Sequence, residues 1–220
     1  PEVWEGVGMI DIVVDGKVLT SSIISVDSLT LNPIGGAPWN AQRISDLTGI
    51  EDFVNLNYLN CPWLNLDTLD LSQNGFLKYL SCSGVPWFGN QGLALKNINI
   101  SQNTALTHLI FNYSQVDSID LSQNVNLSYL ECSQNQLVNL DVSQNIFLDT
   151  LICSYNQLVN LDVSQNSNLS HLLCRNNAHL SNLDLRNGNN INFTFFSAIN
   201  NDSLYCISVD DSIWATNNWL

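Results

Sequence analysis

The nine residues LVNLDVSQN occur at positions 137–145 and again, unchanged, at 158–166, one step of 21 residues later. A chain that repeats itself at such a period folds into stacked units, because one unit alone cannot bury its apolar face. The step from Cys82 to its counterpart Phe111 is 29 residues, so one repeat carries eight extra residues. Successive repeats begin at Tyr58, Tyr79, His108, Tyr129, Thr150 and His171.

The spacing of apolar residues within a repeat predicts short extended segments. Strand alternation sends Leu130 and Cys132 inward and Tyr129 and Glu131 outward. The second half of each repeat has the same apolar spacing, and about ten residues per half leave no room for a long helix. The sequence therefore predicts a β-rich solenoid: a right-handed leucine-rich-repeat coil with a parallel sheet, few helices and 21-residue turns.

Two residue types recur in fixed columns of this alignment. Asparagine amides at bends satisfy backbone groups that have no strand partner. Free cysteine packs as a small apolar residue, and parallel Cβ vectors about 4.8 Å apart exceed the ~3.8 Å of a disulfide, so we expect buried thiols. The cysteine column holds Cys61, Cys82, Cys132, Cys153 and Cys174, and Cys206 ends a related LYC. The asparagine columns hold Asn135, Asn156 and Asn177, and Asn74, Asn103, Asn124, Asn145 and Asn166.

Composition narrows the classes of partner. The chain has 220 residues, 45% of them apolar, enough for one domain with a continuous core. Twenty acidic residues stand against six basic ones, giving a net charge of −14. This charge repels phosphate, so we expect no nucleic-acid partner and no binding to anionic membranes. No apolar run approaches the roughly 18–20 residues of a membrane span, so no membrane insertion is expected.

The residues ISDLTGIEDFVNLNYLNC (44–61), the repeated CSQNQLVNLDVSQN and the ending NNDSLYCISVDDSIWATNNW (200–219) resemble the leucine-rich-repeat regions of secreted and cell-surface proteins of Bacteroidota. The 21-residue cysteine-bearing unit is also similar to that of cysteine-ladder internalins. The resemblance implies type IX secretion, a location outside the cell or on its outer surface, and a non-catalytic role in binding or adhesion. In that family a sorting domain follows the repeats, so the resemblance also implies a longer parent protein.

We expect residues 1–220 to form one leucine-rich-repeat domain. Residues 1–50 are predicted to be an N-terminal cap and lead-in segment, because β-rich runs around a DG turn suit the cover of the first coil. Residues 51–190 are predicted to be repeats, with an insertion near 84–92. Residues 191–220 are predicted to be a C-terminal cap, in which Phe193, Phe195, Phe196 and Trp214 seal the last coil.

Outward aromatic residues are the candidates for ligand binding, because aromatics give a large contact area at little entropy cost. The alternative is that cross-strand aromatics only stabilise the sheet. Three Pro-Trp pairs place Trp39, Trp63 and Trp87 along one edge of the first coils, with Trp87 in the insertion. A tryptophan cluster beside Asn and Gln suits sugar rings; the alternative is that this loop folds over an apolar flank as part of the cap. The candidate residues are Tyr58, Trp63, Tyr79, Trp87, Phe88, His108, Tyr113, Tyr129, Tyr155 and His171.

Catalytic and metal signatures are weak. His108 and His171 share a column but stand three repeats apart, about 14 Å, and His171 and Cys174 point to opposite faces of the strand. We therefore predict that the chain is not an enzyme and has no cofactor or metal, although the Asp, Ser and Asn oxygens of DVSQN leave calcium bridging open as a generic alternative. Bacteroidota attach O-glycans at Asp-Ser/Thr-apolar triplets, and the resemblance implies glycans on some of Ser28, Thr68, Ser118, Thr150, Ser203 and Ser212.

The sequence thus predicts an extracellular recognition or adhesion module. Its expected partner is a protein or a glycan, or another part of a larger surface protein. The alternative is a structural spacer segment within a large type IX-secreted surface protein, whose faces bind nothing in particular.

Overall fold

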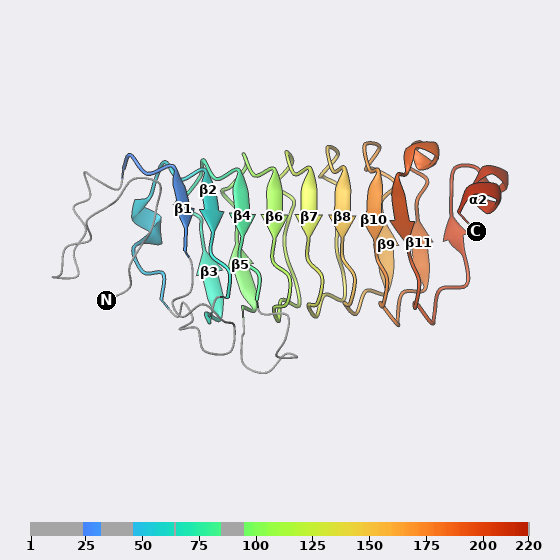
Figure 1. The fold of residues 1–220 in the computed structure, drawn as a ribbon, viewed down its shortest axis with the longest axis horizontal. Coiled ribbons are helices and arrows are strands. Elements are labelled where there is room, and N and C mark those ends of the chain that lie inside the picture. The colour runs from blue at the N-terminus through green and yellow to red at the C-terminus, as the bar shows by residue number, and fades with distance from the viewer. Residues whose placement is uncertain (1–23, 32–45, 64, 85–94, 220) are drawn as a thin grey trace.

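The computed structural model describes residues 24–31, 46–63, 65–84 and 95–219. Figure 1 shows an elongated row of parallel strands that runs from the N-terminal to the C-terminal end of the chain. The largest sheet has eight strands in the order β1-β2-β4-β6-β7-β8-β10-β12. These strands are β1 (Ser28–Thr30), β2 (Tyr58–Asn60), β4 (Tyr79–Ser81), β6 (His108–Ile110), β7 (Tyr129–Glu131), β8 (Thr150–Ile152), β10 (His171–Leu173) and β12 (Phe195–Ser197).

Every neighbouring pair in this sheet is parallel and in the same register. Tyr58 lies beside Tyr79, which lies beside His108, and the column continues through Tyr129 and Thr150. The eight extra residues between β4 and β6 therefore leave the register unchanged. The sheet, together with a buried column of asparagines, confirms the predicted leucine-rich-repeat solenoid.

A second set of short strands lies in the other half of the coils. It consists of β3 (Thr68–Asp70), β5 (Asn97–Asn99), β9 (Asn160–Asp162), β11 (Asn182–Asp184) and β13 (Ile207–Ser208). They pair in two groups, β3-β5 and β13-β11-β9. The equivalent residues 118–120 and 139–141 are not assigned to strands, so the second segment that the repeat pattern predicts in every coil is a strand in only some of them.

The core lies between these two halves and is built from stacked leucines and thiols. In β7, Leu130 is fully buried between half-exposed Tyr129 and Glu131, and Cys132 is fully buried after them. Each buried leucine contributes roughly 1.5–3 kcal/mol. The five cysteines of the predicted column are buried and free. Cys206 differs, because it is exposed and lies outside this column. In the coil of β12, the position after the strand that Cys174 occupies in the coil of β10 is taken by Ala198.

The asparagine columns connect one coil to the next, as predicted. Asn145 donates from Nδ2 to the carbonyl oxygens of Leu121 and Asn124, at 3.2 and 2.9 Å. Asn156 donates from Nδ2 to the backbone carbonyl oxygens of Cys132 and Cys153, and its Oδ1 accepts from the backbone N–H of Leu137 at 3.0 Å. Because an unpaired buried backbone carbonyl is costly, these amides replace strand hydrogen bonds at the bends.

The two ends of the solenoid contain the helical turns. Near the N-terminal end, η1 (Ile50–Asp52) is a single turn of 3-10 helix with Ile50 buried. At the C-terminal end lie η2 (Asn190–Asn192) and the one α-helix of the described residues, α2 (Ser212–Asn218), whose N-cap is Asp211.

An aromatic cluster packs over the last coil. Phe196, Phe193 and Trp214 each contact the ring of Trp219, at centroid distances of 4.9, 5.7 and 5.7 Å. Phe195 does not join this cluster, in contrast to the sequence-based expectation. It is 51% exposed, because it occupies the outward position of β12.

Candidate functional site

The outward face of the eight-stranded sheet carries two columns of half-exposed or exposed side chains. We name this surface the outward face. The first column consists of Ser28, Tyr58, Tyr79, His108, Tyr129, Thr150, His171 and Phe195. The second consists of Thr30, Asn60, Ser81, Ile110, Glu131, Ile152, Leu173 and Ser197. The structure therefore brings five of the candidate residues, Tyr58, Tyr79, His108, Tyr129 and His171, onto one surface.

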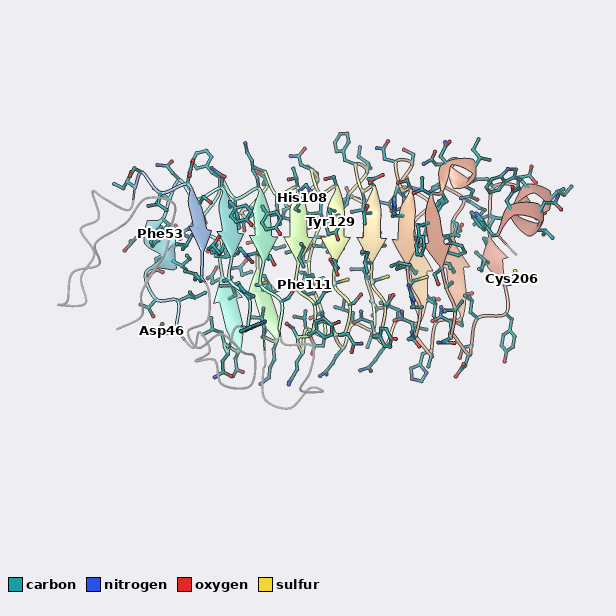
Figure 2. The ribbon with its side chains drawn as sticks, viewed as in Figure 1. Asp46, Phe53, His108, Phe111, Tyr129 and Cys206 are labelled. Atoms are coloured by element: carbon teal, nitrogen blue, oxygen red, sulfur yellow. The ribbon has the colours of Figure 1, made fainter. Side chains whose placement is uncertain are left out.

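Four rings of the first column follow one another, with two stacked pairs joined by one tilted pair. Tyr58 and Tyr79 are nearly parallel, with centroids 4.4 Å apart, and His108 lies 5.9 Å from Tyr79 and 5.7 Å from Tyr129. Figure 2 shows His108 and Tyr129 on neighbouring strands of the sheet. The row ends at Tyr129, because the next residue in the column is Thr150. Each inner ring therefore has an aromatic neighbour on both sides and a stacked neighbour on one of them.

Glu131 belongs to the second column and lies on β7, the same strand as Tyr129, the last ring of the row. The Tyr129 hydroxyl donates to its Oε2 at 2.9 Å, and Asn112 donates from Nδ2 to its Oε1 at 2.6 Å. Burial raises the pKa of Tyr129 to about 12, and both the hydrogen bond to Glu131 and the charge of that carboxylate add to the rise. The phenol is therefore a hydrogen-bond donor at neutral pH.

A second group of aromatic candidates lies in the bend that follows the strands. Trp63, Tyr113 and Tyr155 have left-handed backbone conformations, with φ of 63°, 55° and 57°. Glycine and asparagine adopt this conformation more easily than aromatic residues do. Tyr113 and Tyr155 are 36% and 49% exposed. Gln134, Asn176 and Asn200 adopt the same conformation at this position, so the bend belongs to the repeat and does not require an aromatic residue. The rings that it presents to solvent at Tyr113 and Tyr155 are therefore candidates for function. Trp39, Trp87 and Phe88 lie outside the described residues.

Two features of the outward face were not singled out from the sequence. The first is the aliphatic group of Ile110, Ile152 and Leu173, which are half-exposed in the second column. The second is the hydrogen-bonded carboxylate of Glu131. The alternation of the strands already placed these residues outward, so a search of the outward positions for residues other than aromatics would have found them.

The ionisable groups away from this face are held by local structure. Burial raises the pKa of the Cys82 and Cys174 thiols to about 12, so at neutral pH they are protonated and poor nucleophiles. The backbone N–H groups of Ser122 and Ser143 donate to Asp120 and Asp141 and lower the pKa of each carboxyl. Within the described residues, His, Cys, Asp and Glu form no group of three that would suit a metal ion.

A shallow groove of about 300 Å³ lies between two coils, away from the outward face. Its lining comes from the second segments of the two identical nine-residue repeats, and includes Asn139, Asp141, Ser143, Asn160, Asp162 and Ser164. These residues include oxygens of the DVSQN segments, which the sequence leaves open as generic calcium ligands. The carboxylates of Asp141 and Asp162 each already accept a hydrogen bond, from the backbone N–H of Ser143 and Ser164.

The predicted glycosylation residues fall at scattered positions. Thr68, Ser118 and Ser212 are exposed, and Ser28, Thr150 and Ser203 are half-exposed. The fold accounts for part of the triplet pattern, because the apolar residues Leu29, Leu69 and Leu151 are the inward residues of their strands. Glycosylation stays a prediction.

Comparison with known proteins gives structural matches only. A scan against protein-family models and a search of curated proteins both find no match. The functional domain of InlJ from Listeria monocytogenes, which includes a cysteine ladder, is 23% identical, with a TM-score of 0.40; the match covers 86% of this chain and 54% of that one. This chain therefore spans about half the length of the InlJ domain.

Two further structures are similar at lower identity. Internalin C2 from Listeria monocytogenes is 18% identical, with coverage of 87% and 84% and a TM-score of 0.42. A leucine-rich-repeat protein from Leptospira interrogans is 15% identical, with coverage of 76% and 69% and a TM-score of 0.37. No helix in the described part of the chain has the length and apolar character to cross a membrane.

Proposed function

We propose that this chain is an extracellular, non-catalytic recognition or adhesion module that binds a protein partner through its outward face. The observation that carries the proposal is the continuous pair of half-exposed columns, with stacked rings over β2 to β7 and the aliphatic Ile152 and Leu173 over β8 and β10. Apolar and aromatic side chains beside satisfied polar groups are typical of protein-binding surfaces. The extracellular location rests on the sequence resemblance.

The ring geometry favours a protein over a sugar as the ligand of this face. A sugar ring packs its C–H groups on an exposed aromatic face. Tyr79 and His108 each have aromatic neighbours in the adjacent strands on both sides. They offer their ring edges to solvent, and ring edges suit contacts with protein side chains.

The spacer is the second candidate, and the stacking itself favours it. Rings that cover each other across neighbouring strands also stabilise a sheet without any ligand. The exposed rings of Tyr113 and Tyr155 in left-handed bends speak against this alternative, because a pure spacer gains nothing from an aromatic side chain there.

A pair of matched double variants tests the proposal. Ile152→Ser with Leu173→Ser removes two aliphatic groups from the outward face, and Val138→Ser with Val159→Ser removes two from the second segments, where the valines are 41% and 37% exposed. Labelled protein is applied to arrays of extracellular proteins and of glycans. We expect binding to a protein spot that falls about tenfold or more in the first variant and stays unchanged in the second.

Equal binding by both variants would place the ligand on another surface. Binding to no protein and no glycan by the unaltered chain would favour the spacer. Turnover of any substrate would contradict both candidates.

A further inference from the structure

The outward face contains one carboxylate, and it stands near the middle of the sheet. Glu131 is the acidic member of the two columns; the remaining members are aromatic, aliphatic, amide, hydroxyl or histidine side chains. It lies on β7, the fifth of the eight strands. The residues that contribute most to binding in protein interfaces cluster near the centre of the contact, so this charge occupies the position where a specific contact is strongest.

The Glu131 carboxylate is fixed but not neutralised. Tyr129 and Asn112 each donate one hydrogen bond, to different oxygens of the carboxylate. Each carboxylate oxygen accepts two hydrogen bonds, so both oxygens retain one acceptor position. The ion pairs of the described residues are Lys96 with Asp67 and Arg186 with Asp184, and neither involves Glu131.

The surroundings of Glu131 are apolar on both sides. In the parallel register, Ile110 and Ile152 are its neighbours in the adjacent strands. A partner that covers this face therefore excludes water from the carboxylate and strengthens its attraction for a cation. The positions directly before the first column and two residues after the second column include the charged residues Asp27, Lys78, Asp149 and Arg175. Two of these are acidic and two are basic, so the preference for a cation comes from Glu131 itself.

The ring of Tyr129 adds a second contact for the same cation. Tyr129 is the last ring of the row, and its other neighbour in the column is the smaller Thr150. The side of the ring toward β8 is therefore not covered by an aromatic neighbour. A planar guanidinium stacks on a tyrosine ring and bonds a carboxylate through two parallel N–H groups, which an ammonium group does not do.

We propose that the outward face recognises an arginine side chain on a basic segment of a protein partner. The guanidinium donates to both oxygens of Glu131 and packs against Tyr129, and the aliphatic groups of Ile110 and Ile152 line the contact. The net charge of −14 attracts such a segment at long range. This inference rests on the proposed function, because it names the chemistry of the partner for the same face.

A displayed library of short random peptides, selected on the purified chain, tests the inference. Selected peptides are then measured against Glu131→Gln and against Asp162→Asn, which makes the same change of net charge on the second segment. Each peptide is also made with its arginine replaced by lysine or by citrulline, the neutral analogue. We expect the selected peptides to share an arginine, and affinity to fall about tenfold or more with Glu131→Gln and with citrulline. Lysine is expected to bind between arginine and citrulline, and Asp162→Asn to have little effect.

The outcomes separate this inference from the proposed function. Peptides that lose affinity for the Ile152→Ser, Leu173→Ser variant but bind Glu131→Gln normally would overturn the arginine site and keep the face. Peptides that bind all variants alike would overturn both. Failure to select any peptide would count against both. Circular dichroism of Glu131→Gln tests whether the variant is folded, so that a loss of binding is assigned to the carboxylate and not to unfolding.

Discussion

At the scale of single residues, the direction of each side chain decides its chemistry. A thiol in the inward column lies among leucines, where the charged form is unfavourable, and burial raises the pKa of Cys61 and Cys153 well above the ordinary value. Cys206 lies beyond the column and is exposed. The same residue type is therefore inert in one position and accessible in the other.

The first prediction concerns the reactivity of these thiols. In the native chain at neutral pH, a thiol reagent should modify one cysteine, Cys206, rapidly. The five buried cysteines should react only after unfolding, because they are both inaccessible and protonated. Reagent uptake is followed by absorbance, and Cys206→Ser is the control that should abolish the fast phase. Rapid modification of any thiol in Cys206→Ser would contradict the structure.

The second prediction concerns alkaline pH. In the unfolded chain the thiols ionise near their ordinary pKa of 9.0, whereas Cys82 and Cys174 in the folded chain ionise at about 12. The folded state therefore retains protons that the unfolded state releases, and its stability is fully present below about pH 9 and falls as pH rises toward about 12. Urea midpoints at about pH 8 and pH 10 measure the fall. A variant with Cys82→Ala and Cys174→Ala should lose less stability between the two pH values. An identical fall would contradict the contribution of these two thiols and attribute the effect to other groups with a raised pKa, such as the buried thiols Cys61, Cys132 and Cys153 and the phenol of Tyr129.

At the scale of the repeating element, the bend after each strand sets how closely two coils approach. Gly84 occupies this bend in the coil before the insertion, where its N–H donates to the carbonyl of Asn112 at 2.7 Å. A Cβ at Gly84 would overlap the backbone oxygen of Tyr113 in the following coil. The glycine is needed for close contact, whereas the equivalent Tyr113 and Tyr155 adopt the left-handed conformation.

The third prediction compares two glycines. Gly84→Ala should lower the free energy of unfolding by about 2 kcal/mol or more, because a backbone oxygen cannot move aside as a flexible side chain does. Gly75→Ala is the matched control: the nearest atom to its Cβ, the Gln102 oxygen, would be 3.8 Å away. That variant should be neutral or stabilising by up to about 1 kcal/mol. Chemical denaturation of both variants measures the difference, and equal effects would refute the steric account.

The main elements follow from the sequence because the repeat fixes their register. The period of 21 residues places Tyr129 beside Thr150 before any coordinates are known, and alternation then separates inward Leu130 from outward Tyr129. Cys206 was misplaced because the local pattern LYC does not reveal whether the chain still stacks on the previous coil. Phe195 was misplaced because its bulk suggested a place in the cap, whereas the chain still stacks there and aligns Phe195 with the outward His171. The left-handed bend at Tyr155 gave no signal either, since an aromatic residue is uncommon there.

At the scale of the whole molecule, the solenoid is held by contacts between adjacent coils, so its ends depend on their covers. Trp219 contacts Phe193, Phe196 and Trp214 over the last coil. In such proteins stability is approximately a sum of terms for each repeat and each interface between neighbours. Loss of a cover should therefore weaken the nearest coils first.

The fourth prediction follows from this one-dimensional arrangement. Trp219→Ala should increase amide hydrogen exchange in β10 and β12 while leaving β6 and β7 largely unchanged, because it opens the aromatic cluster at one end. Trp219→Phe is the control and should restore most of the protection. Uniformly faster exchange along the whole sheet would show that the chain unfolds as a single cooperative unit.

The unchanged register across neighbouring coils also bears on how such a chain changes over generations. A duplication of one 21-residue stretch, such as the one that the two identical LVNLDVSQN segments resemble, would add a strand to the sheet without a new core having to be invented. Each such event would lengthen the molecule by about 4.8 Å. The length of the solenoid can thus change by whole repeats, while Glu131 and its neighbours stay unchanged.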